Sequence, residues 1–242
     1  MSAERGSVPT DWDIYYQSVP FTARFTRKYT ESVLIGIIRR FMRNHEPPSV
    51  IELGGANSCF IDGILSAIHP RAYHVIDSNQ YGLTLLRDRM GSRPNVFVHQ
   101  GDVLQFPDAG LRAEIVFSIG LIEHFDASQT RKAINAHFDM LHGGGYAIIS
   151  FPTPTWLYVL ARSIAERLGK WRFTDERPLA PDEVRDAVKG LGEVVFEKTL
   201  WPLVFTQHLI VVRKTRPGPG LTRTSADIRE NSSDISHRTY DG

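Results

Sequence analysis

The sequence has a single cysteine and almost no net charge, and each shortage excludes a class of protein. Cys59 is the only thiol in 242 residues, so an internal disulfide framework cannot form and a reducing compartment is expected. The formal net charge is +1, and no block of lysine and arginine exceeds a few residues. A chain with so small an electrostatic footprint is not expected to bind nucleic acid.

Long apolar runs are also missing. No segment approaches the roughly 18 uninterrupted apolar residues that a membrane-spanning helix needs, and the opening "MSAERGSVPTDWD" has no apolar signal core. We therefore expect a cytoplasmic protein without a transmembrane segment. The hydrophobic fraction of 42% and the length are those of one α/β domain with small additions.

Short apolar runs alternate with helical patterns along most of the chain. This alternation predicts an α/β fold, a doubly wound and mostly parallel seven-stranded sheet with helices on both faces. The first five strands are expected at 49–53, 73–77, 96–100, 114–120 and 146–151. The helices are expected at 29–44, 59–68, 80–90 and 128–141, and "HGGG" at 142–145 is expected to cap the last of these.

The alternation of strand and helix patterns stops after residue 151 and resumes with a helix expected over 181–190. The strands that follow, 193–199 and 207–214, are joined by a connection too short for a crossover, so they are expected to form an antiparallel terminal pair.

Three parts are expected along the chain. Residues 1–46 form an N-terminal lid and helix, with an irregular stretch over the first 20 or so. Residues 47–215 form the main domain, with 152–180 as an insert. Residues 216–242 have almost no aliphatic side chains and are expected to be a disordered tail.

The loop "IELGGANSCF" at 51–60 has the composition of a ligand-binding loop. Gly54 and Gly55 let a ligand approach the backbone closely, and Ser58 can cap the next helix, whose amides favour a negative group. Glu52 is costly at the end of a buried strand unless it is paired. The alternative is a plain glycine turn in which Glu52 caps a neighbouring loop.

Acidic residues also end the second and third expected strands. Asp77, in "HVIDSN", stands where an acid accepts hydrogen bonds from ribose hydroxyls in nucleotide-binding folds. Asp102, in "QGDVLQFP", can accept from an adenine amino group while Val103 packs against the base. Three acids at the ends of three successive strands favour a nucleotide site over an accident.

These segments resemble a known family. "VIELGGANS", "HVIDSN", "QGDVLQFP" and "IVFSIGLIEHF" are similar to successive motifs of the class I S-adenosylmethionine-dependent methyltransferases, strongly over 48–150 and more loosely over 181–214. Ala56 and Ser58 stand where the fuller glycine pattern has glycine, which implies a tighter loop. The missing third glycine, Glu52 and the antiparallel pair disfavour an NAD-binding enzyme.

The resemblance implies S-adenosyl-L-methionine as cofactor and assigns its contacts. Glu52 and the backbone of Gly54, Gly55 and Ala56 would hold the methionine part, and Asp77 the ribose. Asp102 and Val103 would frame the adenine, and the segment from Ser118 to Gly120 would pass beneath the sulfonium.

Glu123 and His124 follow the fourth strand and are the candidate catalytic residues. His124 could act as a general base near neutral pH, or it could only shape the pocket floor. The pair also resembles part of the Glu-x-x-Glu-His metal site of ubiquinone-pathway O-methyltransferases. Gly120 stands where the first Glu of that site would be, so no metal is expected.

The insert 152–180 and the N-terminal "DWDIYYQSVPFTARF" are the expected lids over an acceptor. Within the insert, Leu157, Leu160, Ala161, Ile164 and Leu168 form a helical apolar stripe. The stripe either packs on the core or faces a lipid-linked or membrane-proximal acceptor, which leaves peripheral membrane contact open. "WRFTDERPL" either contacts an acceptor or anchors the loop through salt bridges.

The sequence thus favours a methyltransferase acting on an O or N atom of a small-molecule acceptor. The alternatives are a methyltransferase of a glycan- or lipid-linked biosynthetic intermediate, and a non-catalytic protein that retains the fold. The sequence leaves the acceptor and the oligomeric state open.

Overall fold

The computed structural model describes residues 9–17, 21–43, 46–105, 110–200 and 206–215, so the expected tail at 216–242 lies outside the described residues. Its helices are α1 (Trp12–Gln17), α2 (Phe21–Phe41), α3 (Ile61–Ile68), α4 (Gln80–Met90), the 3-10 helix η1 (Ile122–His124), α5 (Ala127–Asp139), α6 (Trp156–Arg167) and α7 (Pro181–Val188). Its strands are β1 (Ser49–Leu53), β2 (Ala72–Asp77), β3 (Val96–Gln100), β4 (Ala113–Ile119), β5 (Leu141–Pro152), β6 (Gly192–Leu200) and β7 (Gln207–Lys214).

The strands form one seven-stranded sheet in the order β3-β2-β1-β4-β5-β7-β6. β7 runs antiparallel to both of its neighbours, and the other strands are parallel. The predicted fold and its antiparallel terminal pair are therefore confirmed. The strand order reverses direction between β1 and β4, and in such sheets a ligand binds at the carboxyl ends of the strands beside this reversal.

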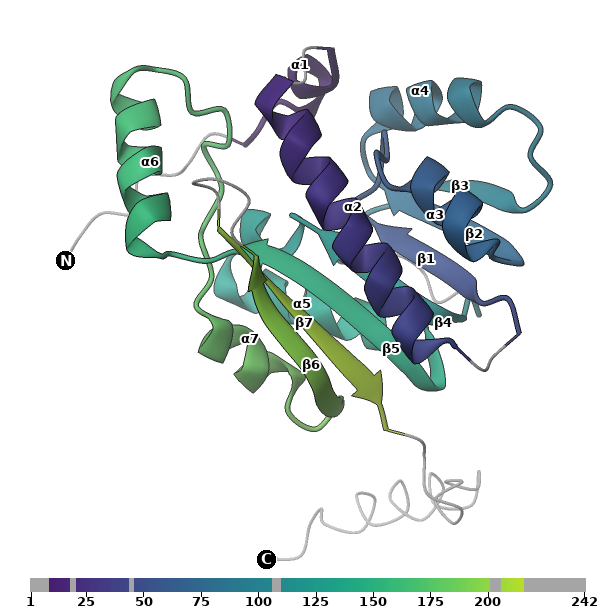
Figure 1. The fold of residues 1–242 in the computed structure, drawn as a ribbon. Coiled ribbons are helices and arrows are strands. Elements are labelled where there is room, and N and C mark those ends of the chain that lie inside the picture. The colour runs from purple at the N-terminus through teal and green to yellow at the C-terminus, as the bar shows by residue number, and fades with distance from the viewer. Residues whose placement is uncertain (1–8, 18–20, 44–45, 106–109, 201–205, 216–242) are drawn as a thin grey trace, which may run out of the picture.

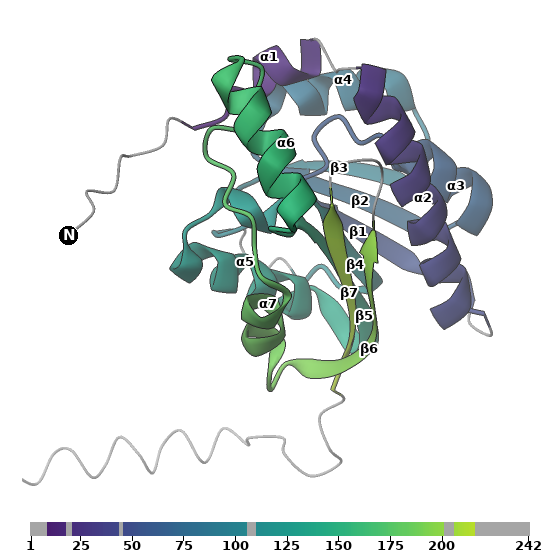
Figure 2. The same ribbon diagram turned by 60° about the vertical axis from the view of Figure 1, so that its left-hand side comes forward.

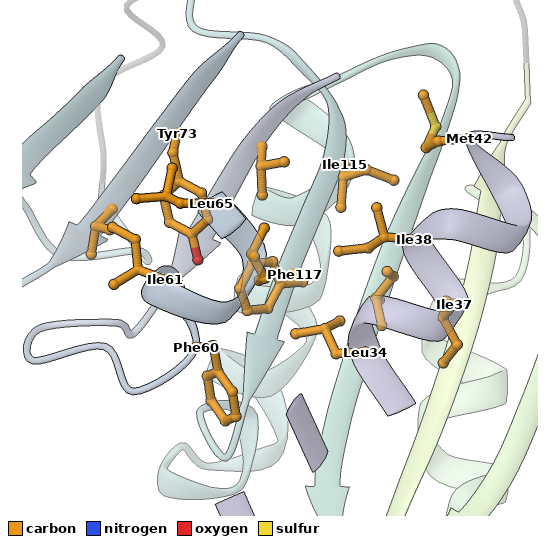
Figure 3. Close-up of a cluster of buried hydrophobic side chains, with 14 of the residues drawn as sticks. Leu34, Ile37, Ile38, Met42, Phe60, Ile61, Leu65, Tyr73, Ile115 and Phe117 are labelled. Atoms are coloured by element: carbon orange, nitrogen blue, oxygen red, sulfur yellow. The ribbon is translucent and has the colours of Figure 1, made fainter. Parts of the chain in front are cut away.

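Helices cover both faces of the sheet because successive residues of each strand point to opposite sides. On β4, Ile115 and Phe117 join a core cluster with α2, α3 and α4, whereas Val116 joins a second cluster with α5 and α7. Figure 1 shows α2 crossing one face of the sheet, with α5 and α7 on the other. Figure 3 shows side chains of α2 and α3 meeting Phe117 and Tyr73 in the first cluster.

The glycines at 143–145 do not cap a helix, which corrects the expectation for "HGGG". Helix α5 ends with Met140 as its cap, at φ −90°, and strand β5 begins at the next residue. The strand pairing is irregular there, and a Cβ on Gly145 would lie 2.8 Å from the carbonyl oxygen of Glu114. The glycines therefore permit a close backbone approach at the start of a strand.

The N-terminal region is more regular than expected. Asp11 accepts the backbone N–H of Ile14 at 3.0 Å and so begins α1 inside the stretch expected to be irregular. Helix α2 begins at Phe21, eight residues before the expected start. In both ribbon views α1 and α6 lie at the same end of the molecule (Figures 1 and 2). Among the helices of the described residues, none is long and apolar enough to cross a membrane.

Candidate functional site

The loop after β1 lies against the loop after β4, on the two sides of the strand reversal. Gly54 has a φ of +74°, and its N–H donates to the carbonyl of Ile76 at 2.9 Å. A Cβ on Gly54 would lie 2.9 Å from Cδ1 of Leu121. Position 54 therefore requires glycine, both for its positive φ and because Leu121 leaves no space for a side chain. This close contact joins the loop after β1 to the loop after β4.

Glu52 supports this loop from beneath. The hydroxyl of Tyr73 donates to Oε2 at 2.7 Å, and that of Ser58 donates to Oε1 at 2.9 Å. The Ser58 oxygen also accepts the N–H groups of Phe60 and Ile61, both at 3.1 Å, as expected for a residue at the start of a helix. The cost of burying the acid is thus offset by two hydrogen bonds.

The carboxyl of Glu52 also fixes the identity of the next glycine. A Cβ on Gly55 would lie 2.6 Å from Cδ of Glu52. Burial raises the pKa of Glu52 to about 7, against the hydrogen bonds from Tyr73 and Ser58, which lower it. The described contacts of Glu52 are to the protein itself, and its contact with a cofactor stays a prediction.

Asp77 accepts two backbone hydrogen bonds at the edge of the site and can still accept hydrogen bonds from a ligand. Its Oδ2 accepts the N–H of Ala56 at 2.9 Å, and its Oδ1 accepts that of Asn79 at 2.7 Å. Burial raises the pKa of Asp77, whereas these backbone hydrogen bonds lower it. Each carboxylate oxygen has a second lone pair, so both can still accept from hydroxyl groups of a ligand.

The end of β3 lies beside the end of β2, because the N–H of Gly101 donates to the carbonyl of Asp77 at 2.9 Å. Asp102 is exposed and accepts the N–H of Leu104 at 2.9 Å. Val103 is half-buried and packs against the second core cluster. The two residues predicted to frame an adenine are thus placed next to Asp77.

The end of β4 turns its polar side chain, Ser118, into the interior of the protein. Ser118 is fully buried, and its hydroxyl lies 2.9 Å from Nε2 of His137, whose Nδ1 lies 2.7 Å from the carbonyl of Ala133. Burial lowers the pKa of His137 to about 4, so the neutral ring donates from Nδ1 and accepts from Ser118. Gly120 has a φ of +73°, a conformation that favours glycine.

Glu123 is the least satisfied acid of this region. It is 2% exposed, and its Oε2 has no hydrogen-bond partner among the described residues. Its Oε1 lies 3.3 Å from the place of a Cβ on Gly120. Burial raises the pKa of Glu123 to about 8, against the charge of His124, which lowers it.

His124 is paired with a residue whose role the sequence left open. Its Nδ1 lies 2.9 Å from Oδ1 of Asp175, which comes from the segment between α6 and α7. Burial lowers the pKa of His124, but the hydrogen bond to Asp175 and the charges of Glu123, Asp175 and Glu176 outweigh it, so the pKa is raised overall. Nδ1–H donates to the carboxylate, and within the described chain Nε2 makes no hydrogen bond.

Asp175 also anchors the N-terminus, so "WRFTDERPL" serves as a loop anchor. The N–H of Thr10 donates to Oδ2 of Asp175 at 3.1 Å, and the Thr10 hydroxyl donates to Oδ1. These bonds and the one from His124 outweigh burial, and the pKa of Asp175 is lowered. A low pKa keeps Asp175 ionised beside the imidazole.

Helix α1 belongs to the N-terminal segment expected to be a lid, and its aromatic side chains make contacts that the sequence did not predict. The Trp12 ring stands edge-on to His124, with centroids 5.0 Å apart. A Cβ on Gly82 would lie 2.9 Å from Cε2 of Tyr16 and 2.7 Å from Cβ of Ala56. The available signal was the aromatic density of "WDIYY", which gave no indication of the elements it meets.

Helix α6 is tied to the same region through Glu176, which follows Asp175 in the chain. The hydroxyl of Tyr158 donates to Oε1 of Glu176, and Arg162 lies 3.6 Å from the same oxygen. Arg162 also donates to the Glu176 carbonyl at 3.0 Å. Within the described ranges, no group of three or more His, Cys, Asp and Glu side chains is arranged to hold a metal ion.

No family model and no curated protein matches the sequence. Solved structures do match in fold. The N-methyltransferase NodS from Bradyrhizobium japonicum WM9, in complex with S-adenosyl-L-homocysteine, superposes with a TM-score of 0.59 at 15% identity, over 84% of this chain and 93% of that one.

Two further structures extend the comparison. Magnesium protoporphyrin IX methyltransferase (ChlM) from Synechocystis PCC 6803, with the same bound product, gives a TM-score of 0.62 at 12% identity, over 82% of this chain and 89% of that one. An O-methyltransferase family protein from Burkholderia thailandensis gives 0.58 at 15% identity, over 81% and 62%. The resemblance found in the sequence is thus confirmed as a shared fold.

Proposed function

We propose that this protein is a methyltransferase that uses S-adenosyl-L-methionine to methylate an O or N atom of a small-molecule acceptor. The observation that carries the proposal is the edge formed by Gly54, Ala56 and Asp77, where a glycine loop meets a carboxylate with free lone pairs. Proteins of the same fold bind S-adenosyl-L-homocysteine. The insert 152–180 and α1 would then cap the acceptor.

The residues present fit this cofactor. Gly54 and Gly55 allow a tight loop packed on Leu121 and Glu52, and Asp77 beside it offers acceptors to two adjacent hydroxyls. Glu52 would hold the loop on its methionine side, Asp102 and Val103 would frame the adenine, and the backbone of 118–120 would line the floor. The bound cofactor supplies a methyl group on a sulfonium, which is electrophilic without further activation.

The protein's own chemistry would be proton removal. Asp175 accepts from Nδ1–H of His124 and so keeps the opposite nitrogen, Nε2, available as the acceptor of a proton. An acceptor hydroxyl or ammonium placed beside Nε2 would lose its proton to it as the methyl group arrives. Glu123, with one oxygen unpartnered, would bind a polar group of the same acceptor.

Calorimetry with S-adenosyl-L-homocysteine tests the cofactor assignment. We expect the protein to bind it and Asp77→Ala to weaken binding by about 1–3 kcal/mol, through lost charge-assisted hydrogen bonds. Asp88→Ala, which removes an exposed acid from the neighbouring α4, should leave binding unchanged. Failure of the unaltered protein to bind would refute the proposal.

Detection of a methylated product would test whether the protein is an enzyme and would identify the atom that it methylates. Host extract incubated with the protein and cofactor should contain a compound heavier by one methylene unit, found by mass spectrometry and formed more slowly with Asp77→Ala at limiting cofactor. Cofactor binding without any such product, over extracts of several growth conditions, would favour a non-catalytic protein of this fold.

A further inference from the structure

Helix α6 presents five large apolar side chains to the solvent. Trp156 is 74% exposed and Leu168 is 61% exposed, and Val159, Leu160 and Ile164 are each close to half exposed. Tyr158 is the buried side chain of this helix. Large exposed apolar patches on a soluble domain mark surfaces that bind something. In the stripe predicted from the sequence, Leu157 and Ala161 are half-buried, whereas Leu160, Ile164 and Leu168 are exposed.

The residues flanking this face are basic. The segment 156–172 contains four basic residues and one acidic residue. The acid, Glu166, is bonded to Arg162 at 2.7 Å. Arg167 and Lys170 are exposed and form no salt bridge with the described residues. An apolar helical face with a tryptophan at one end and unpaired cations at the other is complementary to an anionic lipid surface.

We propose that α6 is a docking surface for an anionic membrane, with Trp156, Leu160 and Ile164 entering the interface and Arg167 and Lys170 contacting lipid headgroups. A second copy of the chain fits less well, because a twofold interface would bring this net-positive segment against itself. The chain ends fit less well too, since 1–8 and 216–242 together contain three leucine and isoleucine residues.

Docking through α6 would fix how the candidate site is oriented relative to the membrane. Tyr158 and Arg162 of α6 hold Glu176, and the preceding residue, Asp175, holds His124. Figures 1 and 2 show α6 at the same end of the molecule as α1, away from the end where β7 finishes. A membrane bound to α6 would therefore lie on the acceptor side of the site.

Flotation with lipid vesicles tests the docking surface. We expect the full chain to float with vesicles of phosphatidylcholine and phosphatidylglycerol, and to float less with phosphatidylcholine alone or in high salt. Leu160→Glu combined with Ile164→Glu should reduce binding by about tenfold or more, because both aliphatic side chains lose their burial in the interface. Arg167→Glu combined with Lys170→Glu should weaken binding to the anionic vesicles but not binding to phosphatidylcholine vesicles.

Val194→Glu is the matched control, because Val194 is an exposed aliphatic residue on β6. It should float as the unaltered protein does, and all variants should keep their melting temperature. Absence of binding to both vesicle types would overturn the proposal. So would a dimer of the unaltered protein that Leu160→Glu and Ile164→Glu dissociate without any vesicle binding. Flotation requires no cofactor, so this result is independent of the methyltransferase proposal.

Discussion

At the scale of single residues, Glu123 shows how burial and charge oppose each other at the candidate site. An unpaired carboxyl oxygen in the interior is costly when ionised, so the acid is held protonated to a higher pH than usual. The pKa of Glu123 is raised from 4.5 to about 8. The folded protein therefore binds a proton more tightly than the unfolded chain between these two values.

This difference predicts how stability changes with pH. A pKa raised in the folded state gives stability that is fully present below the unfolded value and is lost as the pH rises through the folded value. The melting temperature should fall between pH 4.5 and 8, and Glu123→Gln, measured by calorimetry over the same range, should flatten that fall. Asp88→Asn, which neutralises an exposed acid, should not. An equal slope in Glu123→Gln would show that other groups cause the dependence.

His124 and Asp175 give a second prediction at this scale. If His124 is a base, His124→Gln should cut the turnover rate by about 10²–10⁴-fold with cofactor affinity nearly intact, as should His124→Ala. If it only shapes the pocket, the Gln variant should retain much of the activity. The assay needs a weakly acidic hydroxyl or an amine as acceptor, because one that ionises unaided would conceal the effect.

The pH profile of the same reaction separates a positioning role for Asp175 from a merely structural one. Asp175 raises the pKa of His124, so the acidic limb of kcat/KM should lie above the ordinary histidine value of 6.5. In Asp175→Asn the limb should move to lower pH, because the charge that stabilises the imidazolium is gone. A limb that does not move would show that the titrating group is not His124.

At the scale of elements, the loop after β1 depends on the hydrogen bonds beneath it. A Cβ at position 55 would meet Glu52, which cannot move aside while Tyr73 and Ser58 hold both of its oxygens. Gly55→Ala should therefore destabilise the fold by about 1–3 kcal/mol in denaturant unfolding and weaken S-adenosyl-L-homocysteine binding.

Gly36→Ala is the matched control for that substitution. A Cβ at Gly36 meets nothing within 4 Å, and the residue lies within α2. Alanine is preferred over glycine inside a helix by about 0.5–1 kcal/mol, so this variant should be more stable than the unaltered protein. A stable, ligand-binding Gly55→Ala protein would show that Glu52 has another position available.

The sheet and the strand ends were predictable because their signals are local. Runs such as 49–53 and 146–151 are mostly apolar and lack strict alternation of polar and apolar residues, which is typical of strands covered on both faces. The carboxyl end of each strand then placed Glu52 and Asp77 at one edge of the sheet. In contrast, the glycines at 143–145 were assigned to a helix end because a bulged strand start leaves the same local pattern.

The contacts around His124 were not predictable, because they join distant parts of the chain. Asp175 is 51 residues from His124, and Thr10 is 165 residues from Asp175. No pattern along the sequence indicates which acid a histidine meets at that separation. The environment of α6 was also not predictable, because an apolar helical stripe has the same sequence pattern whether a protein core or a lipid surface covers it.

At the scale of the whole molecule, β7 is the last strand among the described residues, and we expect the folded domain to end with it. This strand pairs with both β5 and β6 and is buried along most of its length. Its last residue, Lys214, donates from Nζ to the carbonyls of Phe138 and Leu141 at 2.5 and 2.9 Å. The strand therefore joins the final hairpin to the end of α5 and the start of β5.

Two truncations should separate this boundary from the sequence that follows it. Removing 216–242 should leave the melting temperature nearly unchanged, because that segment has too few aliphatic side chains to bury appreciable apolar surface. Removing 213–242 takes away two strand residues as well, including the lysine that satisfies two carbonyl groups, and should lower the melting temperature by several degrees. Differential scanning calorimetry of the two proteins provides the comparison. Equal and large losses in both would mean that residues beyond 215 dock on the domain, whereas equal and negligible losses would mean that the domain is already complete at Val212.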